Sequence, residues 1–137
     1  MSTRTVARVE FLTDLFTTAM AHGGYGQFTV SDYTDTSATI TFHEGGTHRV
    51  SINTMAHGLR VIREAVMRPV DDISRYSGGD PDMVPHNRKT GQRLYFGGDA
   101  RKHLLKADET NGKDGDYDVI GALAVLECAL FGRVVYA

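Results

Sequence analysis

The residues of this chain that are best suited to chemistry are basic and aromatic side chains that alternate in the segment 88–103. Guanidinium and ammonium groups bind phosphate oxygens, and exposed aromatic rings stack on nucleic-acid bases. This interleaving therefore predicts contact with an anionic ligand such as a nucleic acid or a nucleotide. The alternative is that the turn-like segment 87–91 and the nearby rings serve only the architecture of a loop. The candidate ligand-binding residues are Arg88, Lys89, Arg93, Tyr95, Arg101, Lys102 and His103.

The charges are distributed unevenly along the chain, although the formal net charge is only −2. Residues 1–58 carry three basic and five acidic side chains, residues 59–106 carry ten and six, and residues 107–137 carry two and six. Such blocks predict a basic patch beside an acidic one, which would attract an anionic partner or favour head-to-tail self-association into a homo-oligomer. A solvated surface of mixed charge is the simpler alternative.

No set of residues has the spacing of a metal site. Zinc needs three or four convergent ligands, whereas the chain has one cysteine, Cys128, and no HExxH motif among its six histidines. A calcium loop beginning at Asp114 would place Val119 where a glycine is needed and Val125 where a bidentate glutamate is needed. We therefore expect neither a metal nor a cofactor.

Catalytic templates are also missing from the sequence. There is no GxSxG motif, and the Gly112-Lys113 pair lacks both the preceding glycine and the following hydroxyl residue of a phosphate loop. These observations argue against an enzyme. A small hydrolase with a composite site stays open, because catalytic groups are brought together by folding and not by sequence order. Such a site would require His86 or His103 to approach a carboxylate.

The composition is that of a single soluble domain over residues 1–137, with a long loop at about 68–98. The chain has 137 residues, of which 41% are hydrophobic and 23% charged. The apolar run 119–135 contains glycines and charges that make it a poor membrane span, so we expect no membrane association. The first ten residues lack a secretion signal, and a lone cysteine in an apolar stretch fits a reducing compartment. We expect a cytoplasmic protein.

The first half of the chain predicts a helix followed by three strands. Apolar residues recur every three or four positions in 5–21, which indicates a helix that ends before Gly23-Gly24. Alternation of apolar and polar residues then predicts an antiparallel meander. A three-residue loop, 45–47, would pair Phe42 with Val50 and Ile40 with Ile52, which keeps apolar side chains on one face. It would also place His43 and His48 on opposite faces.

The second half predicts two helices separated by the long loop. A helix begins near its N-cap Thr54 and ends before Pro69, and Gly58 inside it marks close packing against another backbone. The last helix, capped by Asp116 or Asp118 and ended by Gly132, is expected to be the central core helix, with residues 134–136 packing or pairing after it. The predicted fold class is α+β: helix, three-stranded antiparallel sheet, helix, long basic loop and C-terminal core helix. The helices should cover one face of the sheet.

Both ends of the chain resemble a known group of proteins. The segment from Phe11 to Gly24 (FLTDLFTTAMAHGG), the tripeptide at 118–120 (DVI) and the terminal segment 129–136 (ALFGRVVY) resemble a family of small uncharacterised proteins from actinobacteria and their phages. The resemblance covers about half of the chain and does not include residues 68–106. It implies a cytoplasmic accessory protein, encoded by a phage and acting in the host cell cytoplasm, with no catalytic residues to carry over.

These observations lead to three functional hypotheses. The first is a non-enzymatic phage-type accessory protein whose basic central loop binds an anionic ligand, either nucleic acid or a nucleotide. The second is a protein-interaction module that binds and modulates a host protein through the loop or an open sheet edge. The third is the small hydrolase with a composite site. Salt should weaken the first kind of binding much more steeply than the second.

Overall fold

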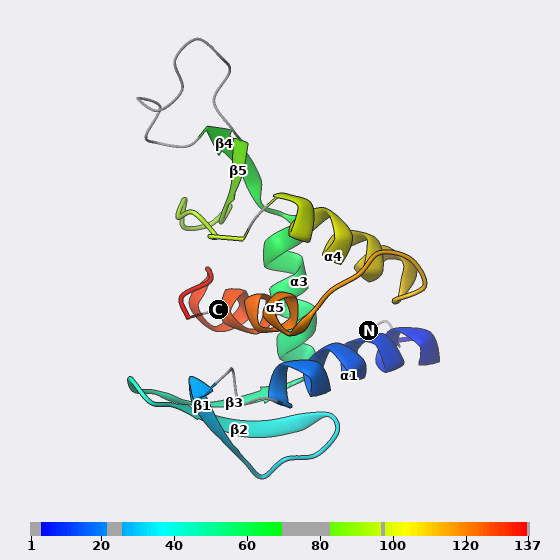
Figure 1. Ribbon diagram of the computed structural model, residues 1–137, viewed down its shortest axis with the longest axis vertical. Coiled ribbons are helices and arrows are strands. Elements are labelled where there is room, and N and C mark those ends of the chain that lie inside the picture. Colours follow the sequence, from blue (N-terminus) through cyan, green and yellow to red (C-terminus); the bar gives the residue numbers. More distant parts are fainter. Residues whose placement is uncertain (1–3, 22–25, 70–82, 97, 137) are drawn as a thin grey trace.

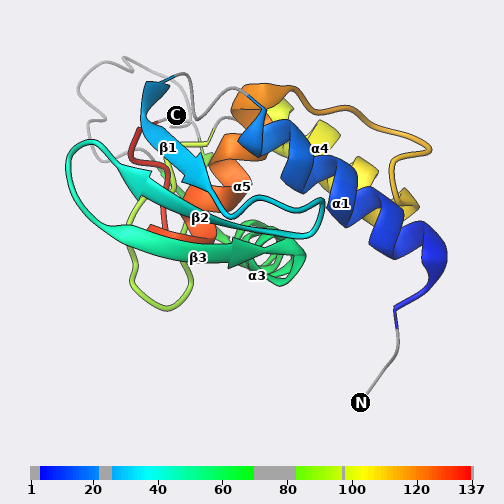
Figure 2. The same cartoon turned by 90° about the horizontal axis from the view of Figure 1, so that it is seen from below.

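The protein has an α+β fold, as predicted, in which helices cover one face of a three-stranded antiparallel sheet (Figure 1). The computed structural model describes residues 4–21, 26–69, 83–96 and 98–136. In these ranges it contains four helices, the sheet β1-β2-β3 and a separate two-stranded ribbon, β4-β5. Figure 2 shows α1 and α5 lying against the sheet, with α4 on the far side of α1.

Helix α1 (Val6–Met20) forms where its caps and its periodicity predict. The side chain of Thr5 accepts a hydrogen bond from the amide of Arg8 at 3.1 Å, which satisfies one of the free donors of the first turn. The helix buries one apolar stripe in the core: Phe11, Leu12, Leu15, Phe16, Ala19 and Met20.

The sheet consists of β1 (Phe28–Ser31), β2 (Ser37–Phe42) and β3 (Thr47–Ser51), in that spatial order. Its inner face buries alternate residues of the strands, while its outer face is polar. On that outer face the Arg49 guanidinium donates to Thr39 Oγ1 at 3.1 Å and to Ser37 Oγ at 2.9 Å. The buried residues on the inner face are Phe28, Ala38, Ile40, Phe42 and Val50.

The predicted register of the second turn is wrong by four residues. Ala38 pairs with Val50, and Ile40 pairs with His48. The Phe42 amide donates to the Gly46 carbonyl at 3.0 Å, so the turn closes over residues 43–45. Both glycines of this turn have positive φ, 117° for Gly45 and 91° for Gly46, and this local geometry fixes the pairing. Because the shift is even, each strand still presents its predicted face to the core.

Helix α3 (Ile52–Arg63) begins earlier than predicted. Its N-cap is Ser51, whose side chain accepts from the Asn53 amide at 3.1 Å, and Thr54 completes the capping box from the third helical position. Thr54 is therefore not the N-cap, and Ile52 belongs to the helix and not to β3. The predicted close approach at Gly58 is confirmed, since a Cβ built there would lie 2.0 Å from the Val125 carbonyl oxygen of α5.

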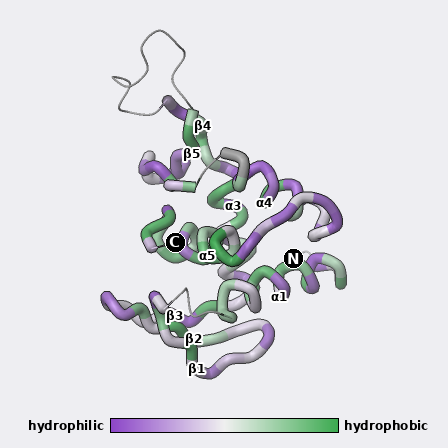
Figure 3. The backbone as a smooth tube through the Cα atoms, in the orientation of Figure 1, coloured by the Kyte–Doolittle hydropathy of each residue, from purple (hydrophilic) through white to green (hydrophobic). Residues whose placement is uncertain are grey.

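Helix α5 (Val119–Phe131) is the core helix that the sequence predicts. Asp118 caps it by accepting from the Gly121 amide at 2.7 Å, and Gly132 ends it in the left-handed region at φ 77°. Its eight consecutive residues 121–128 are buried. Figure 3 shows this hydrophobic helix among elements of mixed hydropathy.

The residues after α5 pack against the body. The buried Glu127 accepts hydrogen bonds from the amides of Val135 at 2.8 Å and Tyr136 at 2.5 Å. The Tyr136 ring stacks on Phe42 with 5.1 Å between centroids. Of the two predicted alternatives, packing and strand pairing, the tail adopts packing, because the Glu127 carboxylate takes the amides that a neighbouring strand would need.

Regular structure occupies only the edges of the predicted long loop at 68–98 within the described residues, and residues 87–92 and 94–96 belong to no helix or strand. Strand β4 (Val66–Pro69) pairs with β5 (Met83–His86), and α4 (Gly98–Thr110) follows. The loop prediction for 70–82 lies outside the described residues. Helix α4 is missing from the predicted order because its central positions are mostly charged and only Leu104, Leu105 and Ala107 mark an apolar face. No helix in the described ranges has both the length and the apolar character to cross a membrane.

Candidate functional site

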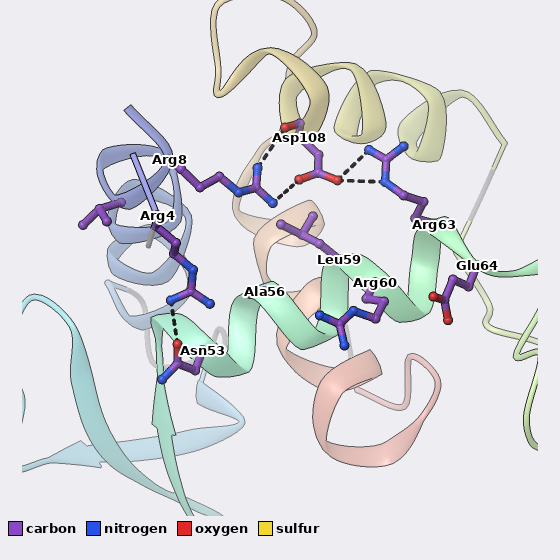
Figure 4. A pocket seen from close by; sticks show the side chains of 10 residues that line it. Arg4, Arg8, Asn53, Ala56, Leu59, Arg60, Arg63, Glu64 and Asp108 are labelled. Atoms are coloured by element: carbon purple, nitrogen blue, oxygen red, sulfur yellow. Dashed lines mark hydrogen bonds and ion pairs between the residues drawn. The ribbon is translucent and has the colours of Figure 1, made fainter. Parts of the chain in front are cut away.

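A cleft of about 840 Å³ lies between the start of α1, helix α3 and the end of α4 (Figure 4). We call it the arginine cleft, because four guanidinium groups line it. Ala56, Leu59 and Val9 form its apolar floor, and Glu64 and Asp108 are its acidic residues. The four arginines are Arg4, Arg8, Arg60 and Arg63.

A buried carboxylate holds two of these arginines in place. The Asp108 side chain is 6% exposed and lies between Arg8 of α1 and Arg63 of α3. Its two oxygens are each 2.6 Å from a guanidinium nitrogen, Oδ1 from Arg8 and Oδ2 from Arg63. The Asp108 carbonyl accepts a further bond from Arg8 at 2.8 Å. One acidic side chain of α4 therefore joins three helices and fixes the orientation of two cations.

The acidic neighbours of Arg63 stabilise its positively charged form. The hydrogen bond to Asp108 raises the pKa of the Arg63 guanidinium, and a second bond to Glu109 at 3.1 Å adds to this effect against the opposing influence of burial. Arg4 is positioned differently, because its guanidinium donates to the neutral Asn53 side chain at 2.6 Å. No carboxylate among the described residues is bonded to Arg4 at the cleft.

Among the four arginines of the cleft, Arg60 is the one whose side chain is available to bind a ligand. Its side chain is exposed on α3 and makes no hydrogen bond or ion pair with the residues that the structure describes. Figure 4 draws no bond from it to the other residues that line the cleft. Its neighbour Glu64, one turn further along α3, also lines the cleft. A phosphate entering the cleft would meet Arg60 without displacing an existing partner.

A second hollow, of about 170 Å³, adjoins the arginine cleft. Arg60 and Glu64 line both hollows, and the predicted residues Arg88 and Lys89 form the far wall. The side chain of Asn87 shapes this wall by accepting from the amides of Lys89 at 2.8 Å and Thr90 at 3.1 Å. The predicted hairpin turn at 87–91 is confirmed, and two of the seven predicted ligand residues lie beside Arg60.

Two more predicted residues form a separate pair. The Arg93 guanidinium lies 5.1 Å from the centroid of the Tyr95 ring, which is a cation–π contact. Tyr95 is 58% exposed and has φ 62°, in the left-handed region that non-glycine residues rarely adopt. Together with Arg133 and Val134, Tyr95 lines a hollow of about 360 Å³.

The remaining three predicted residues are on α4, away from the first four. Arg101 donates to the Ile62 carbonyl near the end of α3 at 3.2 and 3.3 Å, which is a helix-capping role. Burial, and the nearby charge of Arg63, lower the pKa of Arg101. Lys102 is exposed, and His103 lines a hollow of about 210 Å³ with Asp116 and Asp118.

Neither His86 nor His103 is hydrogen-bonded to a carboxylate in the part of the chain that the structure describes. His86 is buried and its Nδ1 lies 3.0 Å from the Val84 carbonyl, so it has no carboxylate partner among the described residues. Both carboxylates beside His103 accept backbone amides, Asp116 from Tyr117 and Asp118 from Gly121. His43 is exposed at its turn, whereas His48 packs against Phe42 and Phe131. Within the described ranges, no three side chains of His, Cys, Asp or Glu are grouped to hold a metal.

The sequence-based list thus overlaps the cleft only at its edge. The structure brings Arg88 and Lys89 to Arg60, whereas Arg101, Lys102 and His103 line neither the arginine cleft nor the second hollow. The four arginines of the cleft were missed, because Arg4 and Arg8 lie in the acidic first block of the sequence. A local signal did exist for the other two, since Arg60 and Arg63 are three residues apart and share a helix face.

The chain was compared with models of protein families, with curated proteins and with solved structures, and none of these matches it. The fold and the geometry therefore define only a class: an α+β protein with an arginine-lined cleft between three helices.

Proposed function

We propose that this protein binds a phosphate-bearing anion in the arginine cleft. The observation that carries the proposal is the exposed Arg60, which lies between the cleft and the second hollow without a partner among the described residues. Guanidinium groups match phosphate oxygens in geometry as well as charge. The ligand class agrees with the one predicted from the sequence, while the site moves from the central loop to helix α3.

The charge of the lining residues supports an anion over a neutral ligand. The cleft has four guanidinium groups and two carboxylates, and Arg88 and Lys89 add two cations in the second hollow. Asp108 pairs with Arg8 and Arg63, and Glu109 pairs with Arg63 as well, so the excess of positive charge comes from the other two arginines. Arg4 and Arg60 face the cleft with no carboxylate bonded to them in the described part of the chain.

Calorimetric titration with sodium tripolyphosphate tests the proposal. We expect binding at about 50 mM salt that weakens steeply by about 200 mM salt, because phosphate contacts release counterions. Arg60→Ala should weaken the affinity about tenfold, the usual scale of one hydrogen bond between charged groups. Arg49→Ala is the matched control, because Arg49 is an exposed arginine on the outer sheet face. Equal affinities of the two variants, or no binding by the native protein, would overturn the proposal.

Binding of a host protein is a second proposal, and the β4-β5 ribbon favours it. Met67 pairs with Pro85, and Pro69 pairs with Met83, so these four apolar residues share one face of the ribbon. Met67 and Met83 are 39% and 50% exposed. Binding through this face would depend weakly on salt, which separates it from binding in the cleft. The phage origin and cytoplasmic location stay predictions of the sequence, and neither proposal depends on them.

A further inference from the structure

The three hollows around α3 and the C-terminal tail follow one another across the molecule. Arg60 and Glu64 line both the arginine cleft and the second hollow. The second hollow extends to Gly132, and the hollow beside Tyr95 includes the next residue, Arg133. The Asn87 side chain holds the Gly132 end of the second hollow by donating to the Gly132 carbonyl at 2.9 Å. These shared and adjacent residues define a path from α1 to Tyr95.

We propose, building on the proposed anion binding, that this path binds the backbone of a single-stranded nucleic acid and that Tyr95 stacks on one of its bases. The path would hold successive phosphates at the cleft and the second hollow. The strand would then reach Tyr95, where one unpaired base lies on the ring.

The charges along the path suit a linear polyanion better than a single small anion. A nucleic acid strand carries one negative charge per nucleotide, so a row of separated cations matches it over its length. Glu64 and Asp108 are the acidic residues that line the three hollows. The basic residues that line the hollows or stack on Tyr95 are Arg4, Arg8, Arg60, Arg63, Arg88, Lys89, Arg93 and Arg133.

Tyr95 is held outward by its neighbours. Leu94 and Phe96 are both buried, and Leu94 is bonded on both sides: its amide donates to the Pro85 carbonyl at 3.0 Å, and its carbonyl accepts from the Val134 amide at 2.8 Å. The chain satisfies these contacts by adopting φ 62° at Tyr95, which turns an aromatic ring to solvent at a conformational cost. A glycine would adopt this conformation without that cost. The exposure of the ring and the cost of its backbone conformation are the observations that support a role for Tyr95 in binding.

An exposed ring beside arginines indicates a single strand and not a duplex. Bases in a duplex are stacked on each other and cannot lie on a protein side chain unless they are extruded. Aromatic rings along a basic groove are the usual means by which proteins hold unpaired bases without regard to sequence. Arg93 already contacts the Tyr95 ring, and the ring keeps more than half of its surface exposed.

Fluorescence anisotropy with a labelled oligothymidylate of about 12 nucleotides tests the path, since known single-strand sites cover about 4 to 16 nucleotides. We expect the single strand to bind more tightly than a duplex of the same length. Tyr95→Gly should weaken the single strand about tenfold, the scale of one lost stacking contact. This variant suits the local φ, so a loss of binding cannot be attributed to misfolding, and a melting curve checks this. Tyr95→Phe keeps the ring and should bind as the native protein does.

Titration with tripolyphosphate separates this inference from the proposed function. Tyr95→Gly should leave tripolyphosphate binding unchanged, whereas Arg60→Ala should weaken both ligands. If tripolyphosphate binds but the Tyr95→Gly variant holds the single strand as tightly as the native protein, the path is wrong and the anion site stands. If tripolyphosphate does not bind and the oligonucleotide does not bind, the proposed function and the path fail together.

Discussion

The two sides of helix α3 differ in the contacts that hold them in place. On one side Gly58 lies so close to α5 that a single added carbon would meet the Val125 carbonyl at 2.0 Å. On the other side Arg60 and Arg63 extend into the arginine cleft, and Arg63 is 41% exposed even where it is paired. The packed side sets the position of the helix. Because Arg60 and Arg63 are on the same helix, the packing of the core also determines where these two cations lie at the surface.

The largest effect is expected from the packed side. Gly58→Ala should destabilise the fold by about 3 kcal/mol, the upper end for overpacking, because the obstacle is a backbone oxygen that cannot rotate away. Urea denaturation followed by circular dichroism measures the change in the free energy of unfolding.

Gly121→Ala provides the matched control on α5. A Cβ there would lie 3.5 Å from its nearest neighbours, which is ordinary contact, and alanine favours a helix over glycine. This variant should be equal to the native protein or more stable by up to about 1 kcal/mol. If both variants lost similar amounts of stability, the close contact of α3 with α5 could not explain the loss in Gly58→Ala.

A smaller effect is expected on the charged side, at Asp108. Asp108→Asn keeps the shape of the side chain but removes the charge that Arg8 and Arg63 share, so we expect a loss of about 2 kcal/mol. The loss is moderate because both arginines are partly exposed and water can solvate them. Glu10→Gln, an exposed change on α1, is the control and should leave the urea midpoint unchanged. A loss as small as that of the control would mean that the three helices do not depend on this carboxylate.

The smallest effect on stability is expected from Arg60→Ala. The side chain is exposed and has no partner among the described residues, so the free energy of unfolding should stay within about 0.5 kcal/mol of the native value. Thermal unfolding without ligand measures this directly. A clear loss of stability would assign Arg60 a structural role, and the charged side of α3 would then stabilise the fold as the packed side does.

Local signals account for what could be predicted from the sequence. Helix α1, the capped core helix and the close approach at Gly58 follow from periodicity, caps and a glycine inside a helix, all of which act within a few residues. Helix α4 was missed because it is amphipathic only through a few residues around Leu104. The β2-β3 register was wrong because two glycines with positive φ close the turn earlier than the apolar pairing suggests.

The cleft could not be predicted because its parts come from distant places in the chain. Arg8 and Asp108 are 100 residues apart, and Arg63 and Asp108 are 45 apart. No spacing rule joins such positions, since only the packing of α1, α3 and α4 brings them together. The predicted segment 88–103 contributed Arg88, Lys89, Arg93 and Tyr95 to the proposed path, and the Asn87 side chain shapes the turn that carries the first two.

The long separation between Arg8 and Asp108 also orders events during synthesis. At about 5 to 20 residues per second, a ribosome needs about 5 to 20 s to add the residues between them. Throughout that interval α1 has neither its ionic partner nor α5, against which it packs in the finished fold. Helix α3 and Tyr33, which contact α1 in the finished fold, emerge earlier and can cover part of its apolar stripe. The edge-to-face contact of Phe11 with Tyr117 and the packing on α5 come last, so the burial of the first helix is completed only when the core helix arrives.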